Sequence, residues 1–435
     1  MHVVPGHGRT GALVPVPEWS AACAADDELA ALAVQARVAF TVRTAEPADG
    51  TLFTFADGRF AGARPLDDAA AGGAEFEVVA PAAAWAEFLA ARPRPTFHSV
   101  FAMLMRVEGT EIHGSELRFA QYCHLVRRVL EVGRQVRSGV AQTRVPATDP
   151  FGPDPVPLGS GYRTLPVAGR PNRVFYEEAG GGRDMIMLHT AGADARQFHH
   201  LLADERLRAR FRMVAPDLPW HGRSFPPPGT AIGGYALTTD DYVDAVVGLV
   251  DALGLTRPIL VGSSMAGLIG LELAYRRPDL FGGVVACEAS DVVPGRQVRW
   301  ALHPEVDQAV FVPEWIDGLM APHTPPEHRQ EIWWTYSQGG FGTFFGDIRF
   351  YSGDFDARDH VARIDTARCP VVMMTGEYDY SCTPQMSRCT AERIPGAEFR
   401  TLPGLGHFPH AENPGVFAGY LLDAVDAIER REVRA

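Results

Sequence analysis

Short apolar runs alternate with helical patterns through the second half of this 435-residue chain. The runs fall at residues 173–177, 185–189, 212–216, 258–261, 283–287, 371–375 and 398–402. Strands separated by helices predict right-handed βαβ units and a mostly parallel sheet with helices on both faces, an α/β fold. Because ligands bind beyond the carboxyl ends of the strands in such sheets, we expect the functional residues in the loops that follow these runs.

The first 138 residues follow a different pattern, which predicts a small α+β domain. We expect a helix, two strands, a turn, a strand, a helix, a hairpin and a long helix, at residues 26–38, 39–42, 51–55, 56–59, 75–79, 81–91, 107–114 and 119–132. From 139 to 171 the periodicity lapses and prolines gather, at Pro146, Pro150, Pro153, Pro155, Pro157 and Pro166. We therefore predict two domains, 1–138 and 172–435, joined by a semi-rigid linker at 139–171.

The amino-acid composition excludes several classes of cofactor and partner. The 40 basic residues are all arginine, which excludes Schiff-base chemistry, a lysine-anchored pyridoxal cofactor and the phosphate loop that ends in Gly-Lys. The net charge of −13 argues against a nucleic-acid partner. Because the six cysteines lack metal-ligand spacing, we expect thiols, no metal and no other cofactor. No apolar run approaches the ~20 residues of a membrane span and the start lacks a secretory pattern, which favours a cytoplasmic protein.

One segment, at residues 258–267, has the form of a nucleophile elbow. A buried apolar strand runs into Gly262-Ser263-Ser264-Met265-Ala266 and then into a helix. In such an elbow the serine lies in a strained turn, with small residues two positions before it and two positions after it. Gly262 and Ala266 occupy those positions around Ser264. Taken alone, the pentapeptide is also compatible with an ordinary glycine-rich turn between a strand and a helix.

Two further residues follow the elbow in the chain order nucleophile, acid, histidine. Asp379 comes after a predicted strand and His407 lies in a later loop. The imidazole would accept the proton of the serine hydroxyl, and the carboxylate would fix the imidazole tautomer and stabilise the imidazolium. Singly, Asp379 would be explained as a helix cap and His407 as a surface residue, but with Ser264 they predict a catalytic triad. Acyl transfer also needs two amides for the oxyanion, which we expect from Met265 and Ala191.

From about residue 172 to the C-terminus the chain resembles the α/β-hydrolase superfamily. The resemblance rests on the His189 loop, the turn at 217–224, the Ser264 elbow, Asp379 and His407. It implies the α/β-hydrolase fold, and it implies that the triad and both oxyanion amides carry over. Two residues depart from the family pattern. Ala266 replaces a glycine of the elbow, and Thr190 replaces the glycine that usually follows the histidine, bringing a hydroxyl that could reach into the site.

A long segment separates the runs at 283–287 and 371–375, and it predicts a lid at about residues 290–365. Its aromatic side chains predict an apolar pocket, although we expect most of them to pack the lid itself. The candidate substrate contacts are Thr190, Trp315, Trp333, Trp334 and Phe344. Three arginines are candidates for a substrate carboxylate, but we expect solvated surface residues: Arg296, Arg299 and Arg349.

The N-terminal domain resembles the sterol carrier protein family in the order of its elements and in residues 53–58, 85–89 and 107–114. The resemblance implies that the domain holds an acyl chain or another lipid-like ligand. The alternative is a docking or dimerisation domain, through which the chain would form a homodimer.

These observations predict a serine hydrolase that cleaves an apolar carboxylic ester or thioester through an acyl-enzyme on Ser264. A first alternative is hydrolysis of a carbon-carbon bond, because the sequence Gly262-Ser263-Ser264-Met265 and the aromatic lid resemble those of the meta-cleavage hydrolases. A second alternative is a binding protein that uses the same fold to recognise a small molecule without turnover.

Overall fold

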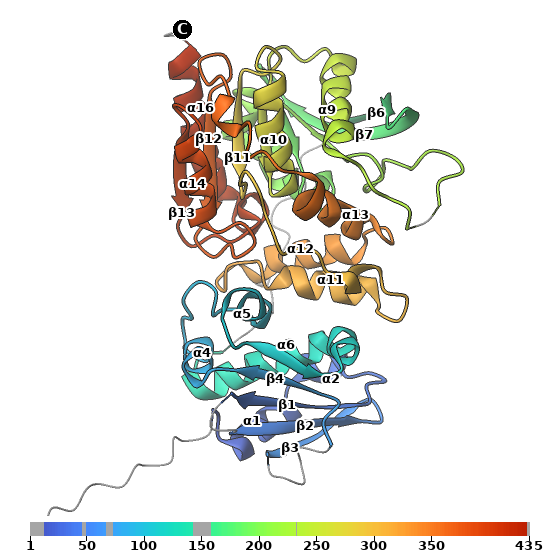
Figure 1. Ribbon diagram of the computed structural model, residues 1–435, viewed down its shortest axis with the longest axis vertical. Helices are drawn as coiled ribbons and strands as arrows, with labels where there is room; N and C mark the ends of the chain where they lie inside the picture. Colours follow the sequence, from blue (N-terminus) through green and yellow to red (C-terminus); the bar gives the residue numbers. More distant parts are fainter. Residues whose placement is uncertain (1–12, 46–48, 67–72, 142–157, 232, 433–435) are drawn as a thin grey trace, which may run out of the picture. The chain divides into compact units, whose positions relative to one another are not determined.

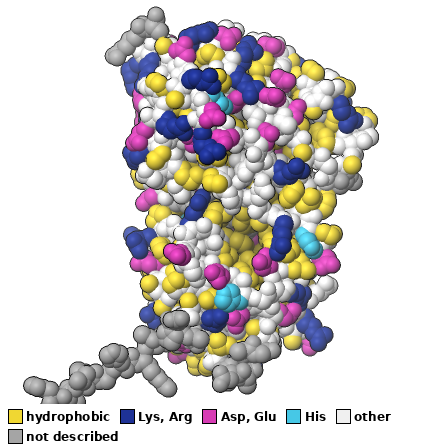
Figure 2. All heavy atoms as spheres, viewed as in Figure 1, with side chains coloured by type: hydrophobic (Ala, Val, Ile, Leu, Met, Phe, Trp, Pro, Cys, Tyr) yellow, Lys and Arg dark blue, Asp and Glu magenta, His cyan; other side chains and the backbone are white. Residues whose placement is uncertain are grey.

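The structure, a computed structural model, describes residues 13–45, 49–66, 73–141, 158–231 and 233–432. The chain divides into two units, Met1–Thr143 and Arg144–Ala435, each with its own sheet (Figure 1). On the face of the molecule shown in Figure 2, acidic and basic side chains are interspersed. Within the described ranges, no helix has the length and apolar character needed to cross a bilayer.

The N-terminal unit has a five-stranded sheet in the order β3-β2-β1-β4-β5. Its strands are β1 (Val38–Thr44), β2 (Gly50–Ala56), β3 (Arg59–Pro65), β4 (Phe76–Ala80) and β5 (Glu111–Gly114). The helices are α1 (Val16–Ala24), α2 (Asp27–Leu32), α4 (Ala82–Phe88), α5 (Val100–Arg106) and α6 (Glu116–Ser138). Phe40 on β1 stacks on Phe53, Phe55 and Phe76 of the two neighbouring strands, so aromatic side chains form the centre of this core.

Two local expectations for the N-terminal unit are wrong. The helix expected over 26–38 ends at Leu32, and Gln35 adopts a left-handed φ of 65° before β1 begins. Residues 107–114 form no hairpin, because β5 pairs instead with β4, in antiparallel register. The helices α1 and α5 and the strand β3 were not expected from the pattern.

The second unit has an eight-stranded sheet in the order β13-β12-β11-β10-β8-β9-β7-β6. The strands are β6 (Gly159–Val167), β7 (Arg170–Gly180), β8 (Arg183–Leu188), β9 (Phe211–Pro216), β10 (Ile259–Ser263), β11 (Gly283–Cys287), β12 (Val371–Gly376) and β13 (Glu398–Leu402). Neighbours from β13 to β9 are parallel, whereas β7 pairs antiparallel with β9 and β6. All seven strand positions expected in this half contain a strand.

Helices cover both faces of this sheet (Figure 1). On one face, α7 (His199–Ala203) and α16 (Pro414–Glu432) enclose a core with Met187, Val261 and Val372. On the other face, α10 (Met265–Arg276) packs against β10 and β11, and its Gly270 lies close to Leu260 and Val284. The central strands β10, β11 and β12 are buried along their whole length and lead into loops at one edge, as in an α/β-hydrolase fold.

The predicted linker extends too far at its C-terminal end. Residues 159–167 form β6, which pairs along its whole length with β7 at the edge of the sheet. Pro166 lies in this strand opposite Pro171, and an edge strand tolerates proline because its outer N–H groups need no partner. The other prolines of the linker, Pro146 to Pro157, lie outside the described residues.

A helical insertion, residues 288–370, separates β11 from β12. It contains α11 (Gln308–Asp317), α12 (Pro326–Ser337) and α13 (Thr343–Arg349), with short helical turns at Arg299–Leu302, Phe350–Asp354 and Val361–Arg363. This segment lies at the position of the predicted lid.

Candidate active site

The turn between β10 and α10 places Ser264 in a strained backbone conformation, with φ 58° and ψ −120°. A non-glycine residue adopts such angles only where its surroundings impose them, at a cost of about 1–3 kcal/mol. Here the Ser264 amide donates to the Cys287 carbonyl at 2.9 Å, which ties the turn to β11. The sequence therefore forms the sharp elbow that the pattern predicted.

Close packing under the elbow explains why alanine is accepted at position 266. A Cβ at Gly262 would lie 2.3 Å from the Ala266 carbonyl oxygen, and one at Gly267 would lie 2.5 Å from the Cys287 carbonyl oxygen. The tightest positions are thus 262 and 267, and both are glycine. Ala266 is also fully buried, but its position does not require a glycine.

We expect Gly262→Ala to destabilise the chain by about 1–3 kcal/mol, because strand and helix must separate to admit the methyl group. The matched control is Gly419→Ala on α16, where a Cβ meets nothing within 4 Å and alanine favours the helix. Urea unfolding of both variants measures the difference. Equal stability of the two variants would contradict the packing argument.

The three residues of the predicted triad form one hydrogen-bonded chain. His407 Nε2 lies 2.8 Å from Ser264 Oγ, and His407 Nδ1 lies 2.8 Å from Asp379 Oδ2. The second oxygen of Asp379 accepts the amides of Ser381 and Cys382 at 2.8 and 3.2 Å. All three side chains are buried. These are the distances that acyl transfer would require between a serine nucleophile, its base and an orienting carboxylate.

A buried carboxylate that the sequence pattern did not reveal fixes the loop of His407. Glu412, in α15 (Pro409–Glu412), accepts the amides of Gly406 and Phe408 at 3.0 and 2.9 Å, on either side of the histidine. Burial raises the pKa of Glu412, and its hydrogen bonds oppose this shift. The loop is therefore held from within the protein and does not depend on contacts with solvent.

The same carboxylate also holds the helical insertion. Glu412 accepts the Ala321 amide and the Thr324 hydroxyl, both at 2.9 Å, and the His407 amide donates to the Leu319 carbonyl at 3.0 Å. Residues 319–324, the turn between α11 and α12, are thereby joined directly to the histidine loop.

The loop after β8 presents the second expected oxyanion amide. Burial lowers the pKa of His189 to about 4, so its ring is neutral; Nδ1 donates to the Thr190 carbonyl and Nε2 accepts the Leu218 amide. These bonds hold the loop in a fixed shape. Among the residues that the structure describes, the amides of Ala191 and Met265 donate to no protein group. Both amides are thus available to a ligand.

Thr190 keeps its hydroxyl inside the site. Its Oγ1 lies 2.5 Å from the Tyr336 hydroxyl of the insertion and 3.1 Å from Gln197 Oε1, which also accepts the Thr190 amide. The replacement of the usual glycine thus gives the loop at residues 189–193, called the oxyanion loop after its expected role, a direct link to α12. Neither Tyr336 nor Gln197 was expected among the site residues.

Asp347 on α13 is a second anchor between the insertion and the oxyanion loop. Its carboxylate accepts the Gly192 amide at 2.6 Å, His221 Nε2 at 2.7 Å and the Tyr242 hydroxyl at 2.5 Å. Burial acts to lower the pKa of His221, but the Asp347 charge overrides it and the pKa is raised; the pKa of Asp347 is lowered in turn. Since His221 Nδ1 also faces a carbonyl, that of Pro219, both ring nitrogens donate and the pair is ionised.

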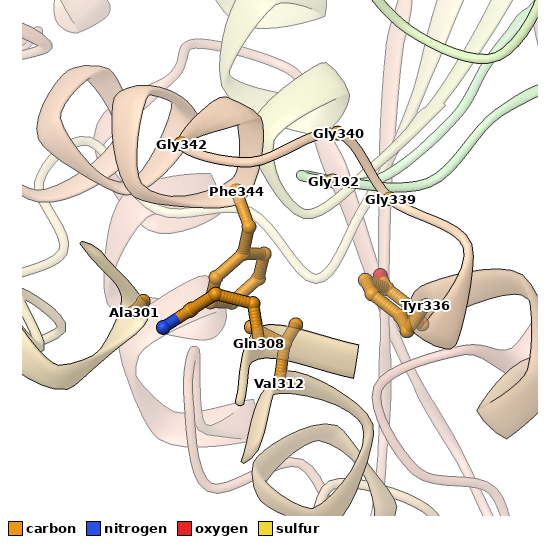
Figure 3. A pocket seen from close by; sticks show the side chains of 9 residues that line it. All are labelled: Gly192, Ala301, Gln308, Val312, Tyr336, Gly339, Gly340, Gly342 and Phe344. Atoms are coloured by element: carbon orange, nitrogen blue, oxygen red, sulfur yellow. The ribbon is translucent and has the colours of Figure 1, made fainter. Parts of the chain in front are cut away.

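A pocket opens beside the oxyanion loop, with about 270 Å³ of space including its mouth. It is lined by Gly192, Ala301, Gln308, Val312, Tyr336, Gly339, Gly340, Gly342 and Phe344 (Figure 3). The rings of Phe344 and Tyr336 lie in the wall on two segments of the insertion, and the Gln308 side chain extends past Phe344 toward Ala301 (Figure 3). The wall thus combines aromatic rings with polar atoms, among them the Gln308 amide and the Tyr336 hydroxyl.

Some of the residues expected to contact the substrate lie at the pocket and others do not. Phe344 lines the pocket, and Trp315 packs edge-on against it at 5.6 Å between ring centroids. Trp334 is 56% exposed and is not part of the pocket wall, so its role as a substrate contact stays a prediction. Trp333 is half-buried and is not part of the pocket wall.

The arginines of the insertion also differ from one another. Arg299 and Arg349 are exposed, as expected, but Arg296 is only 2% exposed. Its guanidinium carbon lies 4.2 Å from the Trp315 ring centroid, a cation–π contact that replaces solvent. The surface position expected for Arg296 is therefore wrong.

Comparison with known proteins gives consistent matches. Residues 185–419 match the family described as the alpha/beta hydrolase family. A 2-(acetamidomethylene)succinate hydrolase of Mesorhizobium japonicum is 25% identical over 260 residues, 58% of this chain and 90% of that protein. A 2-hydroxymuconate semialdehyde hydrolase of a Pseudomonas species is 29% identical over 138 residues, 30% of this chain and 47% of that protein.

A solved structure shares the fold. A thermophilic esterase from Thermogutta terrifontis superposes with a TM-score of 0.54 at 20% identity, over 62% of this chain and 99% of the esterase. The family match covers more than half of the chain and contains the elbow, Asp379 and His407. The chain therefore belongs to the alpha/beta hydrolase family.

Proposed function

We propose that the second unit is a serine hydrolase that cleaves an apolar carboxylic ester or thioester through an acyl-enzyme on Ser264. The observation that carries this proposal is the hydrogen-bonded chain from Ser264 through His407 to Asp379, with 2.8 Å at both links. The hydrolase names of the relatives and the α/β-hydrolase fold support the reaction class.

In the proposed acylation step, Ser264 Oγ attacks the carbonyl carbon while His407 Nε2 takes the hydroxyl proton. Asp379 holds Nδ1–H and stabilises the imidazolium, and the amides of Met265 and Ala191 donate to the oxyanion. Collapse of the tetrahedral intermediate expels the alcohol or thiol, which receives the proton from His407. Water then attacks the acyl-enzyme with His407 as its base, and the carboxylic acid leaves as Ser264 regains its proton.

In this proposal the helical insertion acts as a lid. Ser264 is buried, and Phe344 and Tyr336 of the insertion line the pocket beside the oxyanion loop. Water-poor surroundings strengthen the hydrogen bonds to the oxyanion, and apolar walls favour an apolar acyl group. The Phe344 and Tyr336 rings support this class of substrate, and the Gln308 amide and the Tyr336 hydroxyl are polar groups of the same wall.

A carbon-carbon bond hydrolase is the second candidate. The 2-hydroxymuconate semialdehyde hydrolase among the relatives favours it, since that stretch of similarity is at 29% identity.

A panel of substrates separates the candidates. We expect the purified chain to hydrolyse p-nitrophenyl butyrate and a medium-chain acyl thioester, and to leave a ring-fission dienone unchanged, each followed by absorbance. Consumption of the dienone alone would assign the carbon-carbon reaction instead. Turnover of none of the three would favour the binding protein and contradict the proposed hydrolysis.

The N-terminal unit lies outside the residues matched to the family. Its resemblance to sterol carrier proteins and the alternative of a homodimer both stay predictions. We propose the first, in which the unit binds an acyl chain, since acyl binding would suit an ester or thioester substrate. Retention of a fluorescent fatty acid by the full chain in gel filtration tests it.

A further inference from the structure

Three side chains outside the candidate active site converge on one point of the second unit. They are His200 on α7 and His328 and Glu331 on α12, and their ligand atoms all lie within 4.8 Å of one another. His200 Nε2 is 2.7 Å from Glu331 Oε2, and His328 Nδ1 is 3.5 Å from the same oxygen. We propose that these residues form a binding site for a divalent transition-metal ion such as Zn²⁺.

The donor set has the chemistry that Zn²⁺ prefers. Two imidazole nitrogens and one carboxylate oxygen are a common set for this ion, with a fourth position left for water. His328 Nδ1 is buried and makes no hydrogen bond within the described residues, so it is a candidate donor atom for the ion.

The geometry needs only a small adjustment. Zinc-to-ligand distances of about 2.0–2.2 Å place the ligand atoms of a tetrahedral site about 3.3 Å apart. His328 and Glu331 are three positions apart on one helix, which places them on the same face, and their atoms already meet this spacing. The side chains of His200 and Glu331 are 41% and 47% exposed, so they have room to rotate and an ion has access.

Such a site would join the insertion to the body of the unit. His200 belongs to a helix that packs on the sheet, whereas His328 and Glu331 belong to α12. The same α12 carries Tyr336, whose hydroxyl bonds Thr190 next to the Ala191 amide. Metal binding would therefore hold α12 against the oxyanion loop, which goes beyond the proposed hydrolysis and does not depend on it.

The test is titration of the full, chelator-treated chain with ZnCl₂ by calorimetry, repeated with His328→Ala and Glu331→Gln. We expect one Zn²⁺ to bind the unaltered chain, and each variant to lose at least about tenfold in affinity, as loss of a ligand requires. Thermal unfolding should show a zinc-dependent increase in Tm in the unaltered chain that both variants lack. The control is His113→Ala, because His113 lies 2.9 Å from Glu111 and 3.9 Å from Glu77, but in the described part of the chain these ligand atoms do not converge on one point.

Circular dichroism of the metal-free variants checks that they are folded, which matters most for His328→Ala because the His328 side chain is only 19% exposed, against 47% for Glu331. Two results would overturn the proposal. One is an unaltered chain that shows no zinc binding up to millimolar concentration. The other is affinity in His328→Ala and Glu331→Gln equal to that of the unaltered chain and of His113→Ala.

Discussion

Replacing Ser264 by alanine is expected to reduce turnover of the best ester substrate by a factor on the order of 10⁶. Ser264 Oγ is the hydroxyl that lies 2.8 Å from His407 Nε2, so its removal eliminates the nucleophile and leaves the base without a proton to accept. Steady-state kinetics measure the loss. Labelling by a fluorophosphonate probe, which reacts with activated serines, should disappear in the same variant.

The neighbouring serine is the matched control. Ser263 Oγ donates to Glu288 Oε2 at 2.9 Å and points into the protein, away from His407. Burial, together with the nearby Asp379 charge, raises the pKa of Glu288. We expect Ser263→Ala to keep labelling and most of its turnover. If Ser263→Ala lost labelling and Ser264→Ala retained it, the reactive serine would be Ser263 and the proposal would be wrong.

Replacing Asp347 by asparagine is expected to lower the free energy of unfolding by about 3–5 kcal/mol. The substitution leaves the buried imidazolium of His221 without its carboxylate and disturbs the bonds to Gly192 and Tyr242. Because Gly192 follows Ala191, turnover should also fall. Asp356→Asn is the control, since that carboxylate pairs with Arg358 on the surface and should change stability by less than about 0.5 kcal/mol.

The effect of Asp347→Asn should depend on pH. The raised pKa of His221 means that the pair stabilises the fold fully below the ordinary value of 6.5 and loses this contribution as the pH rises through the raised value. The lowered pKa of Asp347 means that the contribution is present above 3.8 and is lost as the pH falls through the lowered value. Urea unfolding should therefore show the largest difference from the unaltered chain between pH 3.8 and 6.5. A difference independent of pH would contradict an ionised pair.

The parts of the molecule that sequence reasoning predicted are those with a local signal. Each strand of the second sheet from β7 onward is a short apolar run, and the elbow needs small residues at fixed positions around Ser264. The strand β6 was missed because Pro166 and its glycines read as linker, and only pairing with β7 at a sheet edge makes such a segment extended. Propensity in this segment was overridden by tertiary contacts.

The parts that were missed depend on contacts between distant positions. Glu412, Asp347 and Tyr336 have no motif, and each becomes informative only when the insertion meets the catalytic loops. Trp334 is exposed, and composition alone could not tell which face of α12 is buried. The aromatic content predicted an apolar pocket without identifying its walls.

The double role of Glu412 limits how this protein can be redesigned. Chimeras that exchange substrate-binding segments between relatives would naturally cut at the ends of the insertion, yet Ala321 and Thr324 share one carboxylate with the amides that flank His407. A transplanted segment without matching donors would leave that acceptor partly unsatisfied and the base displaced. Grafts that begin after Thr324 and end before β12 preserve this joint, provided that they also keep Tyr336 and Asp347, which bond the loop after β8.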